Sequence, residues 1–76
     1  MLNDLLSAAV DQDERLGCRR VDRTLGIQSM PDGYALMLNP DCSHFYWLRH
    51  DGAESAQHWS KWAVYRWAKN DAADNA

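Results

Sequence analysis

The sequence of 76 residues has few cysteines, no excess of basic residues and no long apolar run. Two cysteines are too few for the disulfide framework of a small secreted domain. A membrane-spanning helix needs about 20 consecutive apolar residues, and no stretch of the chain approaches that length. The N-terminal stretch MLNDLLSAAV has no Lys or Arg before its apolar residues, so it is not typical of a signal peptide. We therefore expect a cytoplasmic protein with reduced thiols and no membrane partner.

The motifs of common enzyme families are also missing. The sequence contains no glycine-rich phosphate loop, no GxSxG motif and no HExxH motif. Cys42, His44 and His50 share one strand parity, but Cys42 and His50 would lie about 26 Å apart on a straight strand. A structural zinc site needs four ligands, and no CxxC pair supplies them. We expect no enzymatic activity, no cofactor and no metal ion.

The spacing of the apolar residues predicts two kinds of local structure in the first two thirds of the chain. Near the N-terminus they recur every three to four residues, which predicts a helix that Gly17 ends. Further along they alternate with polar residues, which predicts strands. The expected helix spans residues 4–16, and the expected strands span residues 21–27, 34–38 and 44–50.

A second helix is predicted after the last strand. Asp51 is a suitable N-cap, and Glu54 at the third helical position can reach back to it. The helix would run to about Asn70, and the small and polar residues 71–76 would form a frayed acidic tail. Residues 1–70 would then make up a single domain.

The predicted order α-β-β-β-α indicates a two-layer α+β domain, in which a three-stranded antiparallel meander has both helices packed on one face. The other face of the sheet would stay open and carry Met37, His44, Tyr46 and His50. An open apolar face or a free strand edge would favour a homodimer. The predicted core consists of Leu5, Leu6, Ala9, Val10, Leu25, Ile27, Leu36, Leu38, Trp47, Trp59, Ala63 and Trp67.

This order of elements over about 70 residues is similar to that of the double-stranded-RNA-binding domain. That family binds duplex RNA through a basic, KKxAK-type start of its second helix. The corresponding residues 52–61, GAESAQHWSK, contain one Lys and one Glu and match no part of the motif. The resemblance supports the predicted fold and argues against RNA binding.

The aromatic residues are the strongest functional signal in the sequence, because seven of the eight lie within 23 residues. Adjacent strand residues point to opposite faces of a sheet, and the second helix has an outer side, so the core cannot hold all of these rings. Exposed Trp and Tyr beside Arg or Lys are typical of protein interfaces. The predicted partner-binding residues are Tyr46, Trp62, Tyr65, Arg66 and Lys69.

These features predict a small, non-catalytic module that binds another protein. Small acidic domains rich in tryptophan are typical of accessory proteins carried by phages and mobile elements. Such proteins inhibit a host complex by occupying one of its surfaces, as anti-CRISPR proteins do. We therefore expect an inhibitor of this anti-defence kind.

The alternative hypothesis is a nucleic-acid-binding or regulatory module. Four arginines oppose one aspartate in residues 15–23, which gives this segment a net charge of +3. The chain as a whole has a net charge of −3, so it lacks the basic excess that supplies most of the affinity in non-specific nucleic-acid binding. The arginines of this alternative patch are Arg15, Arg19, Arg20 and Arg23.

Overall fold

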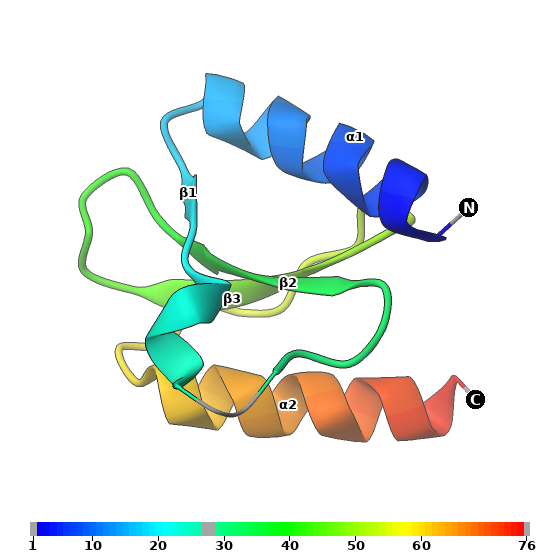
Figure 1. Ribbon diagram of the computed structural model, residues 1–76. Coiled ribbons are helices and arrows are strands. Elements are labelled where there is room, and N and C mark those ends of the chain that lie inside the picture. Colours follow the sequence, from blue (N-terminus) through cyan, green and yellow to red (C-terminus); the bar gives the residue numbers. More distant parts are fainter. Residues whose placement is uncertain (1, 27–28, 76) are drawn as a thin grey trace.

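The computed structural model describes residues 2–26 and 29–75, and it shows two helices on opposite sides of a three-stranded antiparallel sheet (Figure 1). The central strand of the sheet is β2, which lies between β1 and β3. The α+β class, the order of the helices and strands and the antiparallel meander are confirmed. No helix in these two ranges is long and apolar enough to cross a membrane. In chain order the elements are α1 (Leu2–Arg15), β1 (Arg19–Arg20), the 3-10 helix η1 (Asp22–Leu25), β2 (Tyr34–Leu38), β3 (Phe45–Arg49) and α2 (Lys61–Asp74).

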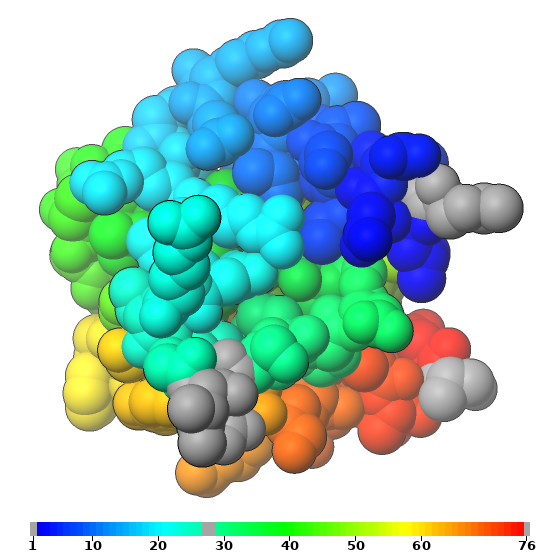
Figure 2. Space-filling model, viewed as in Figure 1, coloured from blue at the N-terminus to red at the C-terminus, as the bar shows by residue number. Residues whose placement is uncertain are grey.

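Each face of the sheet has its own hydrophobic core, because alternate residues of β2 point in opposite directions. Ala35 and Met37 pack toward α1, whereas Tyr34 and Leu36 pack toward α2. The space-filling view shows α1 in blue and α2 in yellow to red, with the rest of the chain filling the space between them (Figure 2). The core beneath α1 consists of Leu6, Ala9, Val10, Ala35, Met37, Tyr46 and Leu48, and the core above α2 consists of Leu25, Met30, Tyr34, Leu36, Trp47, Val64 and Ala68.

The prediction that both helices pack on one face of the sheet is wrong. The face expected to be open carries Met37 and Tyr46, which are 0% and 2% exposed beneath α1. The physical reason is the composition of β2, which reads YALML and has apolar side chains on both faces. A strand of this kind must be covered on both sides. The protein therefore has three layers, with the sheet in the middle.

The strand predicted over residues 21–27 is also wrong, because η1 occupies most of this segment. The Thr24 N–H and hydroxyl both donate to the Val21 carbonyl, at 3.0 and 2.8 Å, which closes the 3-10 turn. The carboxylate of Asp22 accepts a hydrogen bond from the Leu36 N–H of β2. The Asp22 side chain thus binds the backbone of β2 at Leu36, where the backbone of a neighbouring strand was expected.

Helix α2 begins and ends later than the sequence analysis predicted. Its N-cap is Ser60 rather than Asp51, and the Ser60 hydroxyl accepts a hydrogen bond from the Ala63 N–H. At the other end the helix continues to Asp74, so the expectation of a frayed tail over residues 71–76 is wrong for its helical part.

Asp71 holds the last turns of α2 on the sheet. Its carboxylate accepts hydrogen bonds from the guanidinium of Arg49, at 2.8 Å, and from the hydroxyl of Tyr34. Arg49 also binds Asp51 through two hydrogen bonds of 2.9 Å. These bonds explain why the end of the chain is ordered as a helix and why Asp51 does not cap one.

Residues 53–58 run along the outer edge of β3, and two isolated bridges join them to the strand. At the centre of this segment the Ser55 N–H donates to the Trp47 carbonyl, at 3.0 Å, and the Ser55 hydroxyl accepts from the Trp47 N–H, at 2.9 Å. Backbone groups of β3 that would otherwise lack partners are paired in this way. This pairing prevails over the local helix signal of the capping box.

Six of the twelve predicted core residues are buried, and three others are exposed. Leu5 is 55% exposed, Trp59 is 73% exposed and Trp67 is 36% exposed. The buried stripe of α2 is formed by Val64 and Ala68, one residue further along the chain than predicted. Of the other predicted members, Leu38 and Ala63 are half-buried, and Ile27 lies outside the described residues.

Candidate functional site

Three of the four tryptophans are exposed, and all three lie in α2 or directly before it. Trp59, Trp62 and Trp67 are 73%, 45% and 36% exposed. The side of α2 that faces the sheet fully buries only Val64 and Ala68, and Tyr65 and Ala72 are partly buried against the same core. A helix that buries small residues and exposes large rings presents an apolar surface to its surroundings.

Four side chains on one flank of α2 line a hollow of about 380 Å³. They are Trp62, Tyr65, Arg66 and Lys69, the four helical members of the partner-binding set predicted from the sequence. Their spacing of three, four and seven residues from Trp62 brings them to one side of a helix. The rings of Trp62 and Tyr65 meet edge to face, with centroids 6.2 Å apart. We call this surface the α2 hollow.

Basic groups lie over both rings of the α2 hollow. The Lys69 ammonium is 5.6 Å from the centre of the Tyr65 ring, and the Lys61 ammonium is 5.6 Å from the centre of the Trp62 ring. Lys61 also donates a hydrogen bond to the Thr24 carbonyl in η1. Cation–π contacts of this kind contribute about 0.5–1 kcal/mol at exposed sites, and they restrict the motion of both partners.

The α2 hollow is basic within an acidic protein. Residues 55–70 contain Lys61, Arg66 and Lys69 and no Asp or Glu, which gives them a net charge of +3. The whole chain has a net charge of −3, so the other residues carry −6. Arg66 is exposed and forms no ion pair with any residue that the structure describes. The hollow therefore combines aromatic surface with positive charge that is not neutralised.

The opposite flank of α2 gathers the other exposed rings around His58. The imidazole stacks on Trp59, with centroids 5.2 Å apart, and meets Trp67 edge to face at 5.4 Å. Its Nδ1 accepts a hydrogen bond of 2.9 Å from the Ser60 N–H. The sequence analysis placed both tryptophans in the core. Ser60, a favoured N-cap residue just before a helical stretch, was the signal that could have corrected this.

Trp67 also borders a groove of about 430 Å³ on this flank. Asp71 and Asp74 line the groove together with Trp47 and Asn70. The groove thus has acidic groups, whereas the α2 hollow has basic ones. The two flanks of one helix therefore differ in the sign of their charge.

Tyr46 does not belong to either surface. It is 2% exposed on the α1 side of the sheet, and its hydroxyl donates a hydrogen bond of 2.6 Å to the Asp13 carboxylate. Burial, and next the hydrogen bond to Asp13, raises the pKa of the Tyr46 hydroxyl above its usual value. The prediction of an exposed Tyr46 depended on an open sheet face, and it is wrong because α1 covers that face.

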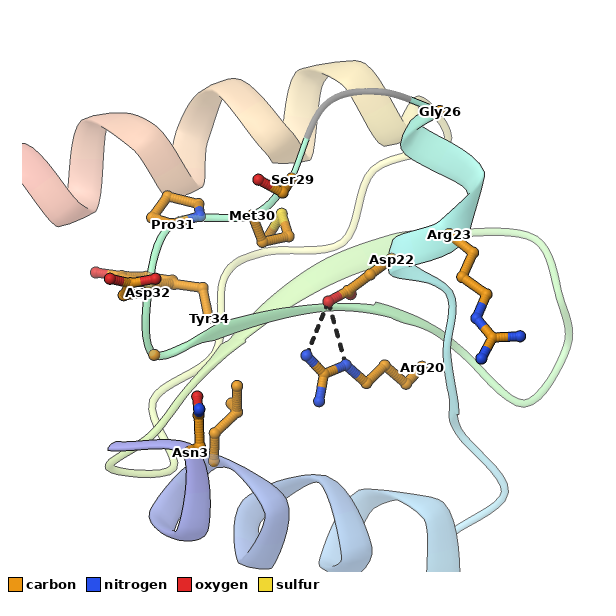
Figure 3. Close-up of a pocket in the computed structure, with 12 residues that line it drawn as sticks. Asn3, Arg20, Asp22, Arg23, Gly26, Ser29, Met30, Pro31, Asp32 and Tyr34 are labelled. Atoms are coloured by element: carbon orange, nitrogen blue, oxygen red, sulfur yellow. Dashed lines mark hydrogen bonds and ion pairs between the residues drawn. The ribbon is translucent and has the colours of Figure 1, made fainter. Parts of the chain in front are cut away.

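The four arginines of the alternative patch come from three different elements, and two of them, Arg20 and Arg23, line a hollow together. Arg19 and Arg20 are consecutive in β1, so their side chains leave the sheet on opposite faces. The guanidinium of Arg20 is also paired, because it donates two hydrogen bonds, of 2.9 and 3.1 Å, to the Asp22 carboxylate (Figure 3). Arg15 lies in the last turn of α1, and Arg23 lies in η1.

A second hollow of about 380 Å³ lies beside the Arg20–Asp22 pair, between the start of α1, η1 and the turn before β2 (Figure 3). Arg23 lines it as well, and its guanidinium points away from the pair. Asp32 adds a second acidic group to the lining. Two basic and two acidic side chains thus balance each other, and the lining has no net charge that would attract an ion.

The nucleophilic and metal-binding side chains are dispersed. Cys18 and Cys42 are free thiols. His44 contacts the Ser43 hydroxyl at 2.8 Å, and the ring of His50 lies against Gly33. Within residues 2–26 and 29–75, no three His, Cys, Asp or Glu side chains are grouped so that they could hold a metal ion.

No family model matches the chain, and no curated protein or solved structure is significantly similar to it. The resemblance to the double-stranded-RNA-binding domain is thus limited to the order of the elements.

Proposed function

We propose that the protein is a non-catalytic protein-binding module that contacts its partner through the α2 hollow. The observation that supports this most is the convergence of two rings and two basic side chains on one hollow of an exposed helix flank. Trp, Tyr and Arg are the residue types that contribute most of the binding energy in protein interfaces. The hollow contains all three types within two turns of α2.

Trp62 is the proposed anchor of the interface. Its side chain is 45% exposed, so a partner can still bury a large part of the ring. Full burial of a large apolar side chain contributes about 1.5–3 kcal/mol. The ring is also restricted by Tyr65 and Lys61, so it loses little conformational freedom on binding.

The inhibitory role expected from size and composition fits this mode of binding. A module that binds through one helix flank would inhibit a host complex by covering a surface that the complex needs, as phage and mobile-element accessory proteins do. We propose a cytoplasmic target, because the cytoplasm keeps thiols such as Cys18 and Cys42 reduced.

Affinity capture with quantitative mass spectrometry tests the proposal. The baits are the wild-type chain, a Trp62→Ala/Arg66→Ala variant and a Trp59→Ala variant. We expect the hollow variant to lose a specific protein at least tenfold, whereas Trp59→Ala, which removes an exposed ring on the other flank, retains it. Thermal unfolding first establishes that both variants are folded. Equal capture by all three baits, or a loss that only Trp59→Ala causes, would contradict the proposal.

Nucleic-acid binding through the arginines is the competing outcome of this experiment. Binding to several phosphates weakens steeply between about 50 and 200 mM salt, whereas binding through an aromatic surface depends little on salt. Capture that nuclease treatment abolishes, and that Arg19→Ala with Arg23→Ala weakens, would favour the alternative.

A homodimer remains a separate prediction, and the structure leaves it less apolar surface than the sequence analysis expected. The sheet face is covered by α1, and the outer edge of β3 is paired with residues 53–58. The exposed leucines Leu2, Leu5 and Leu16 remain as candidate contacts. Light scattering at micromolar concentration decides the question, since a mass near 8.7 kDa corresponds to one chain.

A further inference from the structure

We infer that the partner segment that binds the α2 hollow is an acidic peptide segment with an apolar side chain beside its carboxylates. This inference rests on the proposed function and adds the chemistry of the partner. It is carried by the charge of the hollow, by the spacing of its basic groups and by its aromatic wall.

The charge of the hollow selects a negatively charged partner. Its lining contains Arg66 and Lys69 and no Asp or Glu. Residues 55–70 carry +3, while the remaining residues carry −6. A basic partner would be attracted to the rest of the molecule and repelled by the hollow. An acidic segment is attracted to the basic groups of the hollow and repelled by the rest of the molecule, which favours its binding at this flank of α2.

The spacing of the basic groups suits two carboxylates. Arg66 and Lys69 are three residues apart on α2, which corresponds to a rise of about 4.5 Å along the helix. Acidic side chains three or four residues apart on a helical partner lie about 5–6 Å apart, which is a close match. The guanidinium of Arg66 can bind one carboxylate through two parallel hydrogen bonds, and the ammonium of Lys69 can bind the other.

The aromatic wall of the hollow requires an apolar group on the same segment. Trp62 and Tyr65 form an edge-to-face pair next to the basic groups. The distance from Trp62 to Lys69 along the helix axis is about 10 Å, which accommodates two turns of a partner helix or three extended residues. A leucine or aromatic side chain placed one turn from the carboxylates would cover the Trp62 ring.

The short extent of the basic surface argues against a long polyanion as the partner. After Lys69, residues 70–75 contain no Lys or Arg but include Asp71 and Asp74. A nucleic-acid backbone that followed this flank of α2 would pass beyond the basic groups within about two turns. Non-specific nucleic-acid binding needs several neutralised phosphates, and the hollow offers few basic groups for them.

Selection from a library of short random peptides displayed on phage tests the inference. The wild-type chain is the immobilised target, and enriched peptides are then synthesised and measured by fluorescence anisotropy. Three variants are compared: Arg66→Glu/Lys69→Glu, Trp62→Ala and the control Arg15→Glu/Arg19→Glu. The control changes the net charge by the same amount as the first variant, but at the end of α1 and in β1.

We expect the enriched peptides to share acidic residues and one large apolar residue. Arg66→Glu/Lys69→Glu should weaken the binding of these peptides at least tenfold, which is about 1.4 kcal/mol. Replacing their Asp and Glu by Asn and Gln should have a similar effect. The Arg15→Glu/Arg19→Glu control should bind within a factor of about three, because most of the attraction is local to the hollow.

Three other outcomes would overturn the inference. If the enriched peptides are neutral or basic and Trp62→Ala abolishes their binding, an acidic partner is refuted and the proposed function remains intact. A selection that yields no peptide dependent on Trp62 would contradict both the inference and the proposed function. An oligothymidylate that displaces the acidic peptides and binds more tightly than they do would identify the hollow as a nucleic-acid site.

Discussion

The two helices are joined to the sheet by the same kind of hydrogen bond, but in opposite electrostatic settings. On the α1 side, the hydroxyl of Tyr46 in β3 donates to the Asp13 carboxylate at 2.6 Å. On the α2 side, the hydroxyl of Tyr34 in β2 donates to the Asp71 carboxylate. Asp71 also binds the guanidinium of Arg49 at 2.8 Å. No Lys or Arg of residues 2–26 and 29–75 forms an ion pair with Asp13.

The groups around the two aspartates differ in charge. On the α2 side, hydrogen bonds from Arg49 are the main cause that lowers the pKa of Asp51 to about 2. On the α1 side, burial, and next a hydrogen bond with Asp13, raises the pKa of Glu54. The helix that carries the proposed binding surface is thus fastened by an ion-paired network. The other helix is fastened beside two acidic groups that repel each other when both are ionised.

The largest expected effect compares the two cores directly. Leu36 and Met37 are neighbours in β2, both are 0% exposed, and they face opposite sides of the sheet. Leu36→Ala and Met37→Ala should each lower the free energy of unfolding by about 2–5 kcal/mol, because each leaves a cavity in a closed core. Urea unfolding measures both values. A loss below about 1 kcal/mol for Met37→Ala would mean that α1 does not cover this face.

The next largest effect concerns the two tyrosine hydroxyls. Tyr46→Phe leaves the buried Asp13 carboxylate without this hydrogen bond and should cost about 1–3 kcal/mol. Tyr34→Phe should cost less, because Asp71 keeps its bonds to Arg49. Thermal and urea unfolding of the two variants give the comparison. Equal losses of unfolding free energy would show that the charged groups around the two hydrogen bonds make no difference to stability.

A smaller effect should appear in the pH dependence. The pKa of Glu54 is raised above 4.5 in the folded state, so the folded chain binds this proton more tightly than the unfolded chain does. Stability therefore falls as the pH rises from about 4.5 through the folded-state pKa. Glu54→Gln should raise the stability at pH 7 by less than about 1 kcal/mol, since water screens an exposed side chain. The gain should disappear near pH 3.

Asp51 provides the matched control for this measurement, with the opposite sign. Its pKa is lowered from 3.8 to about 2, so its stabilising effect is present above pH 3.8 and is lost as the pH falls through about 2. Asp51→Asn should therefore destabilise the protein at pH 7, and its effect should disappear only as the pH falls below about 2. Unfolding curves at pH 7 and at acidic pH compare the two variants. If Glu54→Gln and Asp51→Asn change the free energy of unfolding at pH 7 in the same direction, the comparison is contradicted.

The smallest expected effect on stability is that of Trp62→Ala. The ring packs on the surface of α2 against Tyr65 and Lys61, so its removal should cost less than about 1 kcal/mol. Differential scanning calorimetry measures this change. A loss as large as that of Leu36→Ala would place Trp62 in the structural core, and the proposed binding surface would have to be sought elsewhere.

The sequence predicted those parts of the fold that depend on local patterns. Strand β2 lies at the predicted residues, and α1 and β3 differ from their predicted bounds by one or two residues. The failures occur where distant contacts prevail. Asp51 binds Arg49 instead of capping a helix. Residues 21–27 do not form the predicted strand, because the Asp22 carboxylate binds the backbone of β2 instead.

The candidate site divides in the same way. Trp62, Tyr65, Arg66 and Lys69 could be predicted as one group, because helical spacing alone brings them together. The burial of Tyr46 was not predicted, because it depends on which face of the sheet α1 covers. The apolar residues on both faces of β2 indicate that both faces are covered. Which helix covers which face is decided by packing between elements far apart in the chain.

The segment 53–58 along β3 also excludes one mode of peptide binding. Many peptides are recognised by strand addition, in which backbone groups at a free sheet edge pair with an incoming strand. Here one edge is occupied by the protein's own chain, and the other edge, β1, is two residues long and consists of arginines. Short and charged edges are also the features by which natural sheets resist edge-to-edge aggregation. The proposed recognition would therefore use side chains, and the exposed tryptophans of α2 do not lie beside a free sheet edge that could template fibril growth.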